Sequence, residues 1–78
     1  MAWKGLNLLE LRFAALVRQV RDAERERQEA ISAGRIHDAD RLFLEYAAKI
    51  TRGENLAQEL GYREYDAAAR SVERKSLR

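Results

Sequence analysis

The sequence predicts an all-α protein, built as an antiparallel helical hairpin with a short third helix and a C-terminal helix, and assembled as a dimeric helical bundle. The 78 residues contain no proline and only four glycines, and Ala, Leu, Arg and Glu dominate, a composition that favours helices. Apolar residues recur at the three- and four-residue spacing of amphipathic helices. Gly34 and Gly53 each follow such a run, where a left-handed glycine can close a helix.

The chain length limits the protein to one domain, residues 1–78, with a hairpin over 4–52 and a C-terminal segment over 54–76. A chain of 9.0 kDa can bury only about 60% of its extended surface. Thirteen of its residues are alanine, so few large apolar side chains remain to form a core, and a core this small supplies about 3–5 kcal/mol. We therefore expect a partner chain to add buried surface.

The first helix, predicted over residues 4–33, carries apolar side chains on two faces. One face is the stripe expected against the hairpin core, formed by Leu6, Leu9, Phe13, Leu16, Val17 and Val20. Leu8 and Leu11 lie on the opposite side of the same turns at 100° per residue. A single hairpin partner cannot cover both faces.

The second helix, predicted over residues 36–52, should return antiparallel along the first, because the link through Gly34 is short. The predicted interior of the hairpin comprises Phe13, Leu16, Phe43, Tyr46 and Ile50. Leu44 points away from this interior. We therefore expect Leu8, Leu11 and Leu44 to form the surface that contacts a second copy or another protein.

The C-terminal segment should contain two helices, over residues 54–60 and 63–76, separated by a bend at Gly61. In one straight helix, Leu56 and Leu60 would point away from Tyr65 and Val72, so one pair would be left exposed. The bend resolves this conflict. The last helix should then pack through Tyr62, Tyr65, Ala68, Ala69 and Val72.

No catalytic, cofactor-binding or metal site is predicted. The chain has no cysteine and one histidine, His37, and no strand-turn-helix elbow or glycine-rich loop that would build a serine triad. His37 and Asp40 share a helix face at a spacing that could hold a divalent metal, but two ligands are too few for a tight site. The alternative is that His37 is solvated and that Asp38 and Asp40 favour the positive end of the second helix.

The C-terminal segment also suggests contact with nucleic acid. Residues 56–62 resemble the opening of a helix-turn-helix, and the last helix would then be the recognition helix. Residues 1–61 hold ten basic and ten acidic side chains, so the net charge of +2 resides in residues 62–78. The candidate phosphate contacts are Arg63, Arg70, Arg74 and Lys75. Ala67 and Arg70 stand where this motif wants apolar residues, and the other interpretation is a solvated amphipathic helix.

No membrane association is expected, since the longest apolar stretch, from Leu6 to Val20, is interrupted by charged and amide side chains. Trp3 is interpreted as a cap over the bundle end and not as a membrane anchor. The absence of cysteine fits a reducing cytosol, so a cytoplasmic location is expected.

The function predicted from these observations is a non-enzymatic protein–protein interaction module, a homodimer with an unidentified protein partner and no small-molecule substrate. The alternative is a nucleic-acid-binding accessory or regulatory protein.

The chain, and in particular its stretch from Met1 through Ala33-Gly34-Arg35-Ile36-His37, resembles the KleA-like stable-maintenance proteins of IncP broad-host-range plasmids. The similarity covers the whole chain and consists of its size, the general pattern of residue types along it and the lack of Cys and Pro. It carries no diagnostic motif, so no functional residue is transferred. The resemblance implies a bacterial cytoplasmic accessory protein for plasmid inheritance, without catalysis.

Overall fold

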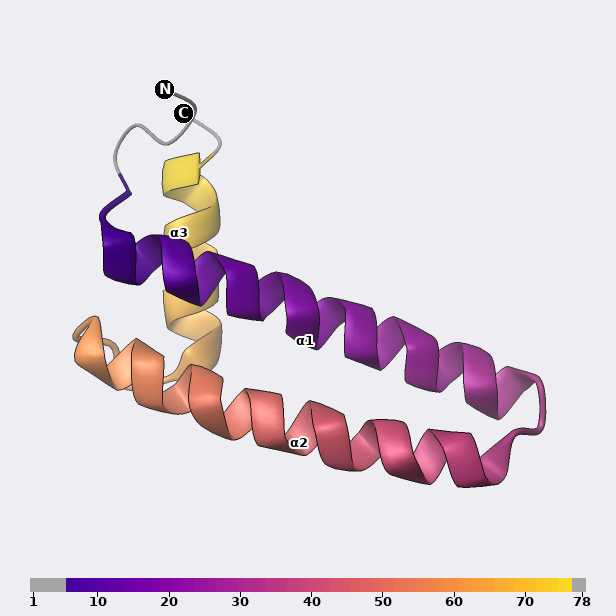
Figure 1. Cartoon of the computed structure of the whole chain (residues 1–78). Helices are drawn as coiled ribbons and strands as arrows, with labels where there is room; N and C mark the ends of the chain where they lie inside the picture. Colours follow the sequence, from indigo (N-terminus) through magenta and orange to yellow (C-terminus); the bar gives the residue numbers. More distant parts are fainter. Residues whose placement is uncertain (1–5, 77–78) are drawn as a thin grey trace.

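The computed structural model describes residues 6–76, which form three helices and no strand. Helix α1 spans Leu8–Ser32, α2 spans Ile36–Glu59 and α3 spans Tyr65–Ser76. Helices α1 and α2 run antiparallel as a long hairpin, and α3 crosses both of them near the end where α1 begins and α2 finishes (Figure 1). We call this the open end of the hairpin, and the Gly34 turn its closed end. The predicted all-α class and hairpin are confirmed.

Helix α1 begins at Leu8 because Asn7 caps it. The Asn7 side chain accepts a hydrogen bond of 2.8 Å from the Glu10 backbone N–H, and the Asn7 backbone N–H donates one of 3.0 Å to Oε1 of Glu10. This reciprocal capping box satisfies two of the backbone donors that a helix start leaves free. The predicted helix start at residue 4 lies outside the described residues. Within them, the helix does not include residues 6 and 7, because Asn7 has an extended backbone and caps it.

A glycine with positive φ follows the C-terminal end of α1, and another follows the C-terminal end of α2. Gly34 has φ 77°, and the next residue, Arg35, donates its N–H to the Ala30 carbonyl at 2.8 Å. Gly61 has φ 94°, and Tyr62 makes the corresponding bond to Ala57 at 2.9 Å. A residue without Cβ adopts this left-handed conformation at no steric cost. The turns predicted at Gly34 and Gly61 are confirmed.

The helix end predicted at Gly53 is wrong, because α2 continues through this glycine to Glu59. Residues 54–60 therefore extend α2 and do not form a separate short helix. Gly53 serves another purpose: a Cβ at this position would lie 2.5 Å from Cε1 and 2.7 Å from Cδ1 of Tyr65. The missing side chain lets the first aromatic residue of α3 lie directly on the backbone of α2.

Tyr65 also contacts α1, where its ring centroid lies 5.5 Å from that of Phe13 at an interplanar angle of 59°. Such a tilted pair is a favoured aromatic arrangement. Burial raises the pKa of the Tyr65 hydroxyl, an effect that the nearby Arg21 opposes. Tyr65 therefore joins all three helices, and its position fixes where α3 crosses the hairpin.

The core is thick at the open end and thin at the closed end. Three helices supply the open-end cluster, in which Phe13 is completely buried and Tyr62, Tyr65 and Ala69 pack at the edge, as predicted; its buried members are Phe13, Val17, Ala57, Ala68 and Val72. The closed-end cluster has only Ala30, Ala39 and Leu42, from two helices. The closed half of the hairpin is thus not covered by a third helix.

The prediction that Phe43 lies inside the hairpin is wrong, since this side chain is 47% exposed. Helix α2 turns Ala39 and Leu42 toward α1, and Phe43 follows Leu42 by 100° around the helix. Phe13 and Leu16 are buried as predicted, whereas Tyr46 and Ile50 are half-buried. The buried interior at the closed end consists of Ala30, Ala39 and Leu42, and Phe43 lies on the flank of the two helices.

We predict that Gly53→Ala destabilises the protein by about 1–3 kcal/mol, because Tyr65 is held by Phe13 and cannot yield to the new methyl group. In a Tyr65→Ala background the sign should reverse, and the same substitution should stabilise α2 by about 1 kcal/mol through helix propensity. Urea unfolding of the four proteins measures this double-mutant cycle. Stabilisation by Gly53→Ala in both backgrounds would contradict the assigned contact.

Candidate interaction surfaces

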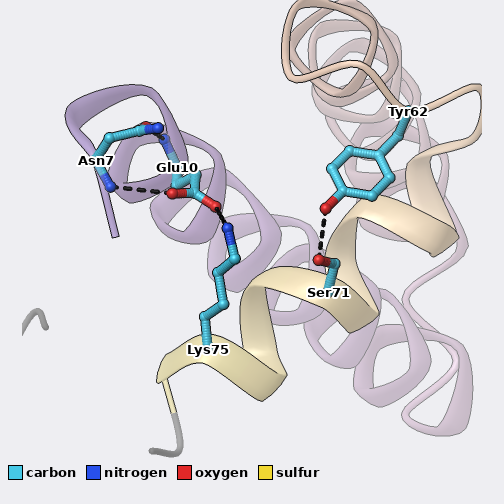
Figure 2. Close-up of polar contacts among 5 residues, drawn as sticks. All are labelled: Asn7, Glu10, Tyr62, Ser71 and Lys75. Carbon is cyan, nitrogen blue, oxygen red and sulfur yellow. Dashed lines mark hydrogen bonds and ion pairs between the residues drawn. The ribbon is translucent and has the colours of Figure 1, made fainter. Parts of the chain in front are cut away.

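Polar contacts at the open end hold α3 on the hairpin (Figure 2). Nζ of Lys75 donates a hydrogen bond of 2.6 Å to Oε2 of Glu10, which is the same residue that closes the capping box with Asn7. The hydroxyls of Tyr62 and Ser71 lie 2.5 Å apart. Arg21 of α1 forms an ion pair with Glu73 of α3. These contacts tie the C-terminal half of α3 to α1 and to the turn before α3.

The Glu10 carboxylate is buried, with 5% of the residue exposed, and it is charged because its partners compensate its loss of water. The hydrogen bond from Lys75 lowers its pKa most, the bond to the Asn7 backbone lowers it further, and burial opposes both. One side chain therefore starts α1 and fastens the far end of α3. Because α3 is held here, it leaves the closed half of the hairpin uncovered.

The uncovered closed half carries an apolar flank shared by both helices. The guanidinium of Arg27 on α1 lies over the Phe43 ring on α2, 5.3 Å from its centroid, so these two positions lie on the same side of the hairpin. Ile31 follows Arg27 by four residues, and Ile36 precedes Phe43 by seven, which places them on that side too. Ile31 is 42% exposed and Ile36 is 58% exposed. We call Ile31, Ile36 and Phe43 the closed-half flank.

Farther along α2, this flank runs into a hollow beside the start of α3. Ile50, seven residues after Phe43, lines the hollow together with Tyr46 and Tyr65. The charged residues that line it are Glu54, Arg63, Glu64 and Asp66. Three carboxylates against one guanidinium make the lining of this hollow acidic, which favours positive charge.

The three leucines predicted as an interface do not form one patch. Leu8 is 66% exposed and Leu44 is 69% exposed, whereas Leu11 is half-buried and lines a shallow groove with Ala14, Ala15 and Arg18. Leu44 lies at the level of Arg27 in the hairpin, because its neighbour Phe43 contacts that residue. At 1.5 Å per residue, it is more than about 20 Å along the hairpin from Leu8. Leu8 and Leu11 form one candidate surface, and Leu44 stands apart.

The basic residues predicted to contact nucleic acid are also divided. Arg63 lies before α3, which begins at Tyr65, so the expected helix start at residue 63 is wrong and Arg63 does not share the face of Arg70 and Arg74. Lys75 is bound to Glu10. Arg70 and Arg74 are exposed on one face of α3. The basic surface that the sequence suggested is thus reduced to these two arginines.

Sequence reasoning missed the closed-half flank as a surface because it assigned Phe43 to the hairpin interior, although Ile36 and Phe43 are spaced by seven residues. His37 is exposed, and residues 6–76 contain no group of three or more His, Asp or Glu side chains placed to hold a metal ion. Within the same residues, no helix is long and apolar enough to cross a membrane, and Trp3 lies outside them.

No protein-family profile, curated protein or solved structure matches the chain. Its exposed surfaces are therefore the features from which a function can be inferred.

We predict that Glu10→Gln lowers the stability at neutral pH by about 1 kcal/mol, a value reduced because Lys75 is partly exposed. The glutamine can keep the capping box but not the charged bond. The pKa of Glu10 is lowered in the folded state, so its contribution is present above the ordinary value of 4.5 and is lost as the pH falls below it. Unfolding midpoints measured from pH 7 to pH 3 should therefore converge for the two proteins.

The matched control is Glu26→Gln, which removes an exposed carboxylate from the same helix. In Glu26→Gln, the change of the unfolding midpoint between pH 7 and pH 3 should be the same as in the native protein. A stability difference between the native protein and Glu10→Gln that stays constant down to pH 3 would show that the Glu10 charge does not hold α3.

If α3 contacts DNA, Arg70 and Arg74 carry the contact. Affinity for duplex DNA should then fall linearly with log salt concentration, and Arg70→Ala with Arg74→Ala should reduce the slope by about 1.8, since each neutralised phosphate contributes about 0.9. The measurement is a salt titration of binding. No detectable binding near ~50 mM salt, where phosphate contacts are strong, would remove DNA as a partner.

Proposed function

We propose that this chain is a non-enzymatic helical interaction module that works as a homodimer and presents further apolar surface to another protein. The observation that supports this proposal is the exposure of five large hydrophobic side chains on so small a fold: Leu8, Ile31, Ile36, Phe43 and Leu44, each more than 40% exposed. Three of them form the flank of a hairpin half that has no third layer. Apolar surface of this kind on a small domain marks contact with other chains.

The charge distribution supports a protein partner better than nucleic acid. Acidic and basic side chains alternate along both hairpin helices and form pairs such as Arg25 with Asp22 and Arg41 with Glu45. Lys75 is engaged with Glu10, and Glu64, Asp66 and Glu73 dilute the positive charge around α3. A nucleic-acid surface needs a concentrated positive field, whereas a mixed surface with apolar patches suits a protein.

The sequence alone supports the remaining parts of the proposal. A non-enzymatic role is inferred from the single histidine and the absence of cysteine. A cytoplasmic location fits the same absence. The resemblance to KleA-like proteins adds a place for such a module in the inheritance of a plasmid, where an accessory protein would act by binding other proteins. Loss of the plasmid from dividing cells that lack the chain would test this last part.

We predict that sedimentation equilibrium of the full chain gives a mass of twice 9.0 kDa, with dissociation on dilution. A homodimer of this size gains stability from its partner, so its melting temperature should rise with protein concentration. A mass of 9.0 kDa at every concentration, with a constant melting temperature, would contradict the homodimer.

A further inference from the structure

We propose that two copies of the chain dock antiparallel through a single stripe of α2, formed by Ile36, Phe43 and Ile50, with the two-fold axis at Phe43. This inference rests on the proposed homodimer and assigns its interface. The three residues are spaced by seven, which keeps them on one side of the helix. Ile36 and Phe43 are exposed and Ile50 is half-buried, so the stripe is accessible over its whole length.

The spacing makes the stripe complementary to itself. In a two-fold interface, any contact between two different positions occurs twice. Ile36 and Ile50 are each seven residues from Phe43, or about 10.5 Å along the helix. A two-fold axis at Phe43 therefore sets Phe43 on the partner's Phe43, and Ile36 on the partner's Ile50, in both directions. Every large apolar side chain of the stripe then meets another one.

The charges at the two ends of the stripe fit the same arrangement. Arg35 immediately precedes Ile36 and is exposed, and its 3.4 Å contact with Asp38 is an exposed pair of the kind that contributes little. The antiparallel arrangement brings Arg35 to the acidic hollow beside the partner's Ile50, where Glu54, Glu64 and Asp66 face one Arg63. Arg35 of each copy thus approaches the acidic lining of the other's hollow, where it can exchange its exposed contact with Asp38 for the partner's carboxylates.

Helix α3 limits how far the two hairpins can overlap. It begins at Tyr65, which lines the same hollow as Ile50, so a second hairpin lying on the stripe would meet the start of α3 when its closed end reaches Ile50. The overlap is then fixed at the length of the stripe, about 21 Å. Arg27, already stacked on Phe43, would border the central aromatic pair on each side.

The chain exposes more surface than a compact monomer of its mass. The protein is elongated, 42 × 24 × 17 Å, and exposes 5814 Å², against about 4,900 Å² for a compact monomer. A two-fold contact along the stripe would bury part of this excess.

Chemical crosslinking tests the register, because the chain has no native cysteine. With a short bis-maleimide, Phe43→Cys alone should give a covalent dimer. Ile36→Cys and Ile50→Cys should give one when mixed but little when each is alone, since in each single variant the two thiols lie about 21 Å apart. The matched control is Leu44→Cys, an exposed neighbour that points away from the stripe, which should crosslink poorly.

A second variant tests the energetics without changing the core. Phe43→Glu should weaken the dimer by roughly 30-fold or more, as expected for a central aromatic anchor, while circular dichroism shows unchanged helicity. Leu44→Glu and the double variant Leu8→Glu with Leu11→Glu should leave the dimer intact. Sedimentation equilibrium measures all three against the native chain.

The possible results of these experiments test the α2 stripe and the homodimer separately. Efficient crosslinking of Ile36→Cys alone, or equal crosslinking at positions 43 and 44, would overturn the antiparallel stripe. A native dimer that is dissociated by the Leu8 and Leu11 substitutions and not by Phe43→Glu would also overturn it, but would keep the homodimer. A chain that is monomeric at all concentrations would overturn both.

Discussion

The contact between Tyr65 and the bare backbone at Gly53 governs the rest of the structure. It is possible only because α2 lacks a side chain at that point, and it brings the Tyr65 ring against Phe13 on α1. Since α3 starts at this residue, the contact determines where the third helix crosses the hairpin. The Glu10–Lys75 bond at the other end of α3 then sets its direction. The Tyr65 contact and the Glu10–Lys75 bond together confine the core that all three helices share to the open half.

The uncovered half follows from this placement. A 12-residue helix cannot cover a hairpin of two helices twice as long. At the closed end, only Ala30, Ala39 and Leu42 are buried between α1 and α2, and large side chains such as Phe43 remain exposed on the flank. The protein thus combines an open end, where three helices share a buried cluster, with a closed half that exposes apolar side chains. That division is the physical basis of the proposed interaction module and of the α2 stripe as its dimer interface.

Much of the fold was predictable because its signals are local. The helical composition, the turns at Gly34 and Gly61 and the apolar face of α3 each depend on a few neighbouring residues, and the structure confirms them. The candidate interface was less predictable. Apolar periodicity marked Phe43 as interior, because a sequence pattern gives the apolar side of a helix but not the rotation at which that side meets its neighbour.

The sequence by itself determined that this chain is helical, that it turns at Gly34 and Gly61, and that it has more apolar residues than one hairpin can bury. These properties depend on composition, on glycine conformation and on chain length, all of which act locally or as totals. The tertiary structure decided the rest: that Gly53 receives a tyrosine and does not end a helix, that Glu10 meets Lys75 across 65 positions, and that Ile36 and Phe43 face outward. Such pairings depend on which small residues let helices approach, and only the packed chain shows that.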